Sequence, residues 1–166
     1  MHLSQGETPD ALKMAIEGRL RALAHAHALL ARSRWAGADL RALVTEELSP
    51  YCQDDPDRAR IEGPSLMLEQ QAAQAMAVAV HELTTNAVKY GALSAPKGRV
   101  SVEWSCDPGR RLTFRWTETG GPPVGPPKRQ GFGARVMERI IQGQLNGELK
   151  FDWRQEGVAC EIIIDT

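Results

Sequence analysis

The sequence lacks the features that would indicate a membrane anchor or a nucleic-acid partner. No apolar run approaches the ~18 residues that a membrane-spanning helix needs, and the first ten residues, MHLSQGETPD, lack the apolar centre of a signal peptide. The formal net charge is only -1, so no overall field attracts nucleic acid or anionic lipid. We therefore expect a cytoplasmic location, no membrane segment and no nucleic-acid partner.

Cysteines are also few. Cys52, Cys106 and Cys160 are far apart, and no metal-binding spacing joins them. Such a set suits a reducing compartment rather than a disulfide framework. The 166 residues are 42% hydrophobic, which is enough for the core of one domain with a helical appendage.

The first part of the chain is predicted to be helical. Thr8 can cap a long helix that starts at Pro9 and runs to about residue 33. Its apolar stripe comprises Leu12, Ile16, Leu20, Leu23, His27 and Leu30. Asp39 can cap a shorter helix that ends near Pro50. We therefore assign residues 1–50 to a helical segment and residues 51–166 to a separate domain.

The rest of the chain changes from helical to strand periodicity. Two short strands are predicted around Gly63–Pro64, followed by an Ala-rich helix over residues 69–90. Alternating apolar residues then predict strands at 100–106, 112–116, 149–153 and 158–164, with a helix at 134–146. We expect these strands to form an antiparallel sheet. Helices must cover one face of this sheet, so the predicted fold is a two-layer α+β sandwich with an N-terminal helical extension.

A narrow polar stripe interrupts the Ala-rich helix. Glu82, Asn86 and Lys89 lie about one turn apart on a helix that is otherwise suited to burial. Carboxylate and amide oxygens suit Mg2+ and its waters, and an ammonium group suits a phosphate. The alternative is a polar seam against the N-terminal helix.

Two other features are candidates for ligand binding. In LTFRWTETGG, the alternation that turns Leu112, Phe114 and Trp116 inward also turns Glu118 inward, where a carboxylate needs a donor such as the exocyclic amine of a base. The alternative is a strand-end side chain that bends out to water. Gly131 and Gly133 precede a helix and would let backbone amides approach a phosphate, although an ordinary loop has the same composition.

These features occur in the order found in one family. The chain resembles the C-terminal half of bacterial sensor histidine kinases of the HWE class, which is named for one histidine, one tryptophan and one glutamate. HELTTNAVKYGALS supplies His81, WTETGG supplies Trp116 and Glu118, and GFGARVMER resembles the second glycine box. The resemblance extends from about residue 10 to the end of the chain.

The resemblance implies a Bergerat-type ATP-binding fold and a role for each candidate residue. Glu82 would be catalytic, either as a base or by orienting the water shell of Mg2+, and Asn86 would be a ligand of the metal. His81 would support Glu82. The remaining residues implied at the ATP site are Lys89, Tyr90, Glu118, Gly120, Gly131 and Gly133, with Glu118 recognising the adenine amine. Residues 121–130 would form a short lid, in which Pro122 stands where the class usually has glycine.

The implied function is transfer of the ATP γ-phosphate to a histidine, for relay to the receiver domain of a response regulator. In this class the phosphoacceptor segment would lie on a helix ahead of GETPD, so we expect it to be missing here and the N-terminal helix to be a remnant of a dimerisation hairpin. We therefore expect a homodimer formed through this helix, no normal autophosphorylation, and a structural role for His25 and His27. Two alternatives are a non-catalytic adaptor that docks a response regulator with a degenerate ATP site, and an ATPase or serine kinase of the same superfamily.

Overall fold

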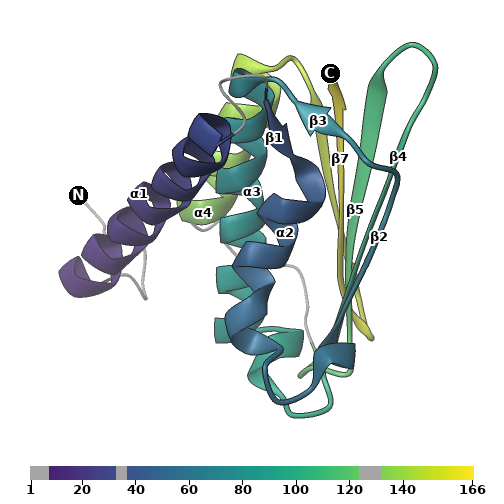
Figure 1. Cartoon of the computed structure of the whole chain (residues 1–166). Helices are drawn as coiled ribbons and strands as arrows, with labels where there is room; N and C mark the ends of the chain where they lie inside the picture. The colour runs from purple at the N-terminus through teal and green to yellow at the C-terminus, as the bar shows by residue number, and fades with distance from the viewer. Residues whose placement is uncertain (1–7, 33–36, 124–131) are drawn as a thin grey trace.

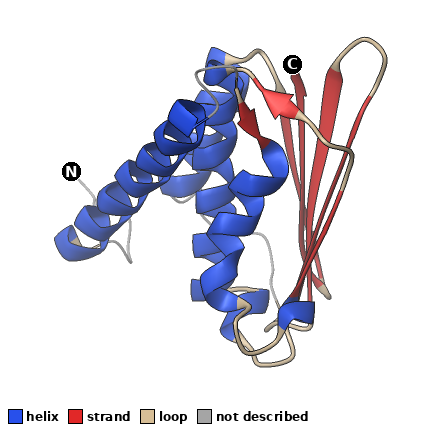
Figure 2. Cartoon of the chain, in the orientation of Figure 1, coloured by secondary structure: helices blue, strands red, loops and turns tan. Residues whose placement is uncertain are grey.

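The computed structural model describes residues 8–32, 37–123 and 132–166, and for residues 25–32 and 132 it describes the backbone alone. In Figure 1 a layer of helices covers one face of a sheet, and a further helix lies outside that layer. Figure 2 shows that the opposite face of the sheet carries no helix in the described residues. The predicted two-layer α+β sandwich with an N-terminal helical extension is confirmed.

The two N-terminal helices begin where the sequence predicts. Helix α1 spans Pro9–Arg32, and the Thr8 hydroxyl accepts a hydrogen bond from the Ala11 amide at 3.1 Å. Helix α2 spans Leu40–Leu48, and the Asp39 carboxylate caps it by accepting from the Ala42 amide at 3.0 Å. Both caps satisfy amides that have no partner within the helix.

Helix α3, Gln70–Lys89, is the centre of the helical layer. Alanine has the highest helix propensity and the smallest side chain of the residues that stabilise helices, so an Ala-rich helix can lie close to its neighbours. Its buried alanines are Ala72, Ala73, Ala75, Ala77, Ala79 and Ala87. The buried side chains of α2 belong to the same core as those of α3 and the sheet. The helical layer of the sandwich therefore begins before residue 50.

The main sheet has five strands in the order β2-β4-β5-β7-β6. The predicted strands are β4 (Arg99–Cys106), β5 (Arg111–Thr119), β6 (Glu148–Arg154) and β7 (Gly157–Asp165), and they pair antiparallel. The fifth, β2 (Ala59–Glu62), pairs parallel with β4. Phe114 and Trp116, in the central strand β5, are fully buried under the helices.

Several short elements differ from the simple expectation. The strand after Gly63–Pro64, β3 (Met67–Leu68), leaves the main sheet and pairs with β1 (Ala38–Asp39). Single 3-10 turns occur at η1 (Ser49–Tyr51), η2 (Pro56–Arg58) and η3 (Ala92–Ser94). The predicted helix at 134–146 is α4, Phe132–Glu138, continued by a π-helical turn, η4, Arg139–Gln144.

The described helices include none that is both long and apolar enough to cross a membrane.

Candidate functional site

Glu118 points into the protein at the end of β5, as its position in the alternating strand predicts. The residue is only 3% exposed. The Ala92 amide donates a hydrogen bond to its Oε1 at 2.9 Å, and the indole Nε1 of Trp116 donates to its Oε2 at 3.0 Å. The carboxylate is therefore held by one donor on each oxygen, from two different elements.

Glycines allow the backbone to approach this carboxylate. A Cβ atom at Gly91 would lie 2.1 Å from Glu118 Oε1, and one at Gly121 would lie 2.7 Å from the Cα atom of Ala92. Gly120 has a φ of +74°, which L-residues with a side chain rarely adopt, so the chain can turn there after β5. Glu118, the turn at residues 91–92 and residues 120–121 thus form one close-packed unit.

The electrostatics of Glu118 are those of a desolvated acceptor. Burial raises the pKa of this carboxyl group, and the hydrogen bonds from Ala92 and Trp116 oppose the rise. An ionised carboxylate has about four acceptor positions, and the two protein donors use one on each oxygen. The group can therefore accept from a further N–H donor of a ligand.

Glu82 is the second buried carboxylate, and three helices meet at it. It is 5% exposed, and its Oε1 lies 2.5 Å from the Arg19 Nε of α1. On the other side, a Cβ atom at Gly133 of α4 would lie 2.2 Å from Glu82 Oε2. The sequence left two interpretations open, and this ion pair is the polar contact with the N-terminal helix that the second one anticipates.

The other predicted residues on α3 and directly after it are exposed, unlike Glu82. Asn86 and Lys89 are exposed, and Tyr90 is 69% exposed. They are therefore accessible to a ligand, whereas Glu82 is covered by α1. Gly131, most of the predicted lid and the side chains of His25 and His27 lie outside the described residues.

His81 faces a different set of neighbours from Glu82. Its Nδ1 lies 3.3 Å from Glu47 Oε2 of α2, and its Nε2 lies 3.5 Å from the Thr85 hydroxyl. A Cβ atom at Gly18 of α1 would lie 2.5 Å from the same Nε2. His81 also lines a cavity of about 280 Å³ between α1, α2 and α3, together with Lys89. These contacts fit a residue that fixes helix packing, and its support role stays a prediction.

Three polar residues near the site were not anticipated from the sequence: Arg19, Glu47 and Arg58. Arg19 and Glu47 contact α3 from α1 and α2, and Arg58 contacts the turn that follows α3. Each pairing depends on how elements far apart in the chain come together. Gly91 did carry a signal, because it directly follows a long helix, but the signal does not identify Glu118 as its neighbour.

Comparisons with known proteins agree with the predicted class. A family model described as HWE histidine kinase matches residues 1–65, and one described as histidine kinase-like ATPase domain matches residues 61–143. A blue-light-activated histidine kinase of Rhizobium johnstonii is 35% identical over an alignment 167 residues long, which covers 99% of this chain and 47% of that protein. One of Brucella ovis is 33% identical over 158 residues, covering 93% and 32%. The chain thus spans about a third to about a half of the length of these relatives.

Solved structures agree on the fold. The histidine kinase domain of the Erythrobacter litoralis EL346 blue-light activated histidine kinase gives a TM-score of 0.72 at 19% identity, covering 90% of this chain and 74% of that one. The Acinetobacter baumannii histidine kinase AdeS gives 0.59 at 17% identity, covering 94% and 79%. The Bergerat-type arrangement expected from the sequence is confirmed.

Proposed function

Because this chain is an HWE-type member of the histidine kinase-like ATPase domain family, we propose that it is the ATP-binding catalytic domain of a two-component sensor histidine kinase. The proposed reaction transfers the γ-phosphate of ATP to a histidine outside the ATP-binding domain, for relay to the receiver domain of a response regulator. The observation that carries the proposal is the buried Glu118 carboxylate, held by Ala92 and Trp116 beside the glycines of residues 91 and 120–121.

Glu118 is the proposed base-reading group. The exocyclic amine of adenine would donate to the free acceptor positions of this carboxylate, which is desolvated and oriented by two protein donors. Guanine has a carbonyl oxygen where adenine has this amine, and that oxygen would face the carboxylate with no proton to form a hydrogen bond. The site should therefore prefer ATP to GTP.

Glu82 and Asn86 are the proposed metal-site residues. Their oxygens suit a hard cation such as Mg2+, which usually keeps several waters and shares its remaining ligands with substrate phosphates. In the described ranges no group of three or more His, Cys, Asp or Glu residues is placed to hold a metal ion, so a metal at this pair would share its coordination with the nucleotide and water. When bound, Mg2+ would neutralise charge on the phosphates. Gly133 packs directly against Glu82 Oε2, where any side chain would clash with the carboxylate.

The exposed end of α3 is the proposed phosphate and ribose side of the site. Lys89 and Tyr90 lie at or directly after the last turn of α3 and are exposed. An ammonium group there can pair with a phosphate as a mobile point charge. We include Gly120, Gly131 and Gly133 as residues that shape the loop around the nucleotide. We propose that His81 supports Glu82 indirectly, by fixing α3 against Glu47 of α2.

The proposed setting follows from the chemistry of phosphorelay. The partners would be a receiver domain and a second copy of the chain, joined through α1. We propose a cytoplasmic location, since ATP is available there and the three cysteines are free thiols in the structure.

The Arg19–Glu82 ion pair favours one alternative. Since Arg19 occupies the carboxylate that would orient the metal's waters, a non-catalytic adaptor with an unused ATP site is the second candidate function. An adaptor does not require Glu82, Asn86 and Glu118 together, so ATP affinity distinguishes the two functions.

Isothermal titration calorimetry with Mg-ATP tests the proposal. We expect binding that weakens when Mg2+ is chelated, and an Asn86→Ala variant with roughly tenfold or greater loss of Mg-ATP affinity, because one charge-assisted contact contributes about 1.5–3 kcal/mol. Asn86 is exposed, so the variant should fold normally. Gln71→Ala removes an exposed amide from the same helix far from the site and is the matched control. Wild-type protein that binds no Mg-ATP would favour the adaptor.

A further inference from the structure

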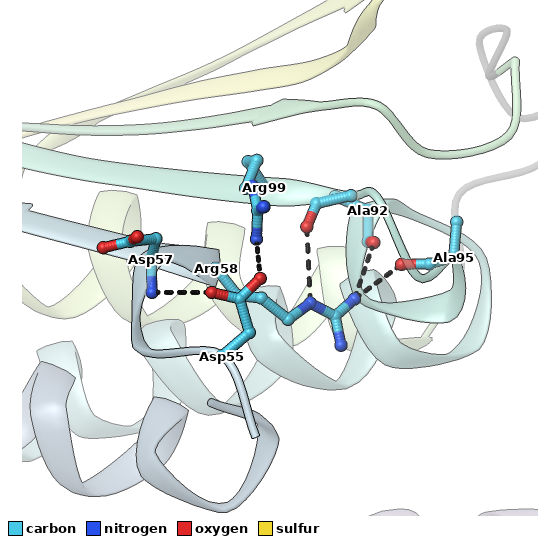
Figure 3. Close-up of polar contacts among 7 residues, drawn as sticks. Asp55, Asp57, Arg58, Ala92, Ala95 and Arg99 are labelled. Carbon is cyan, nitrogen blue, oxygen red and sulfur yellow. Dashed lines mark hydrogen bonds and ion pairs between the residues drawn. The ribbon is translucent and has the colours of Figure 1, made fainter. Parts of the chain in front are cut away.

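One arginine holds together the turn that follows α3. Arg58 ends the short η2 turn, and its Nη2 donates to the carbonyl oxygens of Ala92 at 3.3 Å and Ala95 at 2.6 Å. Its Nε donates to the Gly98 carbonyl at 3.4 Å. Figure 3 shows the guanidinium extended into this turn, with its donors directed at the backbone oxygens. A single side chain thus joins both ends of the segment between α3 and β4.

The same segment supplies a donor to Glu118. Ala92 accepts from Arg58 through its carbonyl and donates to Glu118 Oε1 through its amide, at 2.9 Å. Its surroundings are tight, since a Cβ atom at Gly98 would lie 1.6 Å from the Ala92 oxygen and one at Gly121 2.7 Å from its Cα. A shift of this turn would therefore move a donor of the buried carboxylate.

The η2 turn is itself anchored, so the guanidinium is aimed before any ligand binds. Asp55 accepts a hydrogen bond from the Asp57 amide at 3.1 Å and pairs with Arg99 Nη1 at 2.5 Å. Arg99 is the first residue of β4 and directly follows Gly98. Figure 3 shows this ion pair beside the Arg58 contacts. The Asp55–Arg99 pair and Arg58 fix η2 to the segment from two sides.

Arginine is the residue type that fits this position. Its guanidinium presents several N–H donors in a rigid planar fork, whereas lysine has one flexible nitrogen. One ammonium group cannot reproduce the same directed contacts with three carbonyl groups. The partial burial of these contacts increases the cost of leaving the carbonyls without donors.

We propose that Arg58 is a positioning residue for adenine recognition: it fixes the turn at residues 92–98 so that the Ala92 amide holds Glu118 in the orientation that selects adenine. This inference rests on the proposed ATP-binding function. Arg58 acts through the backbone of Ala92 and has no assigned contact with the nucleotide. It lies far from Glu118 in sequence, yet one residue, Ala92, links the two side chains.

The test compares nucleotide selectivity in the full chain. Arg58→Gln removes the charged fork, Arg58→Lys keeps the charge, and Arg60→Gln is the control. Arg60 lies two residues away and pairs with Glu62 at the surface, with side-chain exposures of 72% and 55%. Affinities for Mg-ATP and Mg-GTP are measured by calorimetry well below each variant's unfolding temperature. The exchange rate of the Ala92 amide proton is measured by NMR.

We expect Arg58→Gln to bind Mg-ATP roughly five- to tenfold more weakly, a typical size for a residue that acts through another. GTP affinity should change little, so the preference for ATP narrows. The Ala92 amide should exchange faster, Arg58→Lys should show an intermediate loss, and Arg60→Gln should resemble the wild type. If Arg58 only stabilised the fold, Arg58→Gln would lower the unfolding temperature and leave the ratio of ATP to GTP affinity unchanged.

The outcomes separate this inference from the proposed function. If the wild type prefers ATP to GTP and the Arg58 variants keep the same preference, the inference about Arg58 is wrong, while the proposed function stands. If Arg58→Gln does not fold, Arg58→Lys decides, and wild-type selectivity in that variant overturns the inference. A wild type that binds no ATP, or binds ATP and GTP equally, overturns the base-reading site and this inference with it.

Discussion

At the scale of single residues, Glu118 has the environment that most constrains its chemistry. It is buried, yet it accepts hydrogen bonds from Ala92 and Trp116. Burial is the largest influence on this carboxyl group and raises its pKa above the usual value of 4.5. The folded protein therefore binds this proton more tightly than the unfolded chain does. Glu118 consequently affects stability and nucleotide binding with opposite pH dependence.

The first prediction concerns this opposition. Because the folded-state pKa is raised, the contribution of Glu118 to the free energy of unfolding is fully present below pH 4.5 and is lost as pH rises through the folded-state pKa. ATP affinity should change in the other direction, since the ionised carboxylate is a stronger acceptor for the adenine amine than the protonated group. Urea unfolding and ATP titrations from about pH 4 to about pH 8 measure both quantities.

Glu118→Gln is the comparison for this prediction. It has no titrating group at this position, so the difference in unfolding free energy between it and the wild type should vary with pH across the range. ATP binding by this variant should be weaker, and its preference for ATP over GTP smaller. A stability difference that stays constant over the whole pH range would contradict the assigned burial effect.

At this scale the sequence predicted the direction in which a side chain points better than it predicted the hydrogen-bond partners of that side chain. The inward direction of Glu118 follows from the two-residue period of a strand whose other inward residues are Leu112, Phe114 and Trp116. The hydrogen bond from Trp116 to Glu118 joins two inward residues of the same strand, so it depends only on the geometry of neighbouring side chains. The donor from Ala92 and the contacts of Arg58 depend on tertiary packing between distant segments. No local pattern in the sequence encodes them.

At the scale of elements, α1 lies across the face of α3 that carries Glu82. Gly18 and Ala22 are buried at this contact, and Arg19 reaches Glu82 between them. Small residues let the two helices approach closely, and the ion pair compensates the buried carboxylate. In the proposed function, docking of α1 and use of Glu82 by a metal would therefore compete for the same carboxylate.

The second prediction tests this competition with Arg19→Gln. Removing the charge leaves a buried carboxylate without its ion-pair partner, so stability without Mg2+ should fall by up to about 3 kcal/mol. Mg-ATP affinity should rise, because Glu82 no longer has to leave Arg19. Thermal unfolding with and without Mg2+ and calorimetry provide the two measurements. Lys13→Gln is the control, since Lys13 is an exposed basic residue of the same helix and does not line the cavity beside Lys89. Unchanged Mg-ATP affinity in a folded Arg19→Gln protein would show that α1 and the metal do not compete for Glu82.

Element prediction was most successful where the periodicity is strong. The four alternating strands and helices α1, α2 and α3 were located from their patterns and caps. The parallel pairing of β2 was not anticipated, because a four-residue strand carries no information about its partner. Neither was the π-helical turn after Glu138. After this turn the Gly147 amide donates to the Ile141 carbonyl at 2.8 Å, a contact that helical periodicity does not reveal.

At the scale of the whole molecule, α1 has one face that packs against α3 and another that stays exposed. The small-residue face contacts α3, and Figure 1 shows the helix inclined against the outside of the helical layer. Much of the predicted apolar stripe is not used in this contact: Leu12 is 36% exposed, Ile16 46% and Leu20 61%. From the sequence we expected a homodimer formed through this helix. The helix folds back through its small residues, and these three side chains remain exposed.

The last prediction follows from this exposed stripe. Adjacent exposed apolar side chains on one helix favour association, and two copies of the same helix can cover each other with twofold symmetry. We expect concentration-dependent dimerisation through α1, measured by multi-angle light scattering and sedimentation velocity. Ile16→Lys with Leu20→Lys should shift the protein to monomer without altering Mg-ATP affinity, because neither residue belongs to the proposed site. Met67→Lys is the matched control, since it also replaces an exposed apolar residue, 46% exposed, with lysine, but on β3. A protein that stays monomeric at the highest attainable concentration would contradict the prediction, as would equal dissociation by the control.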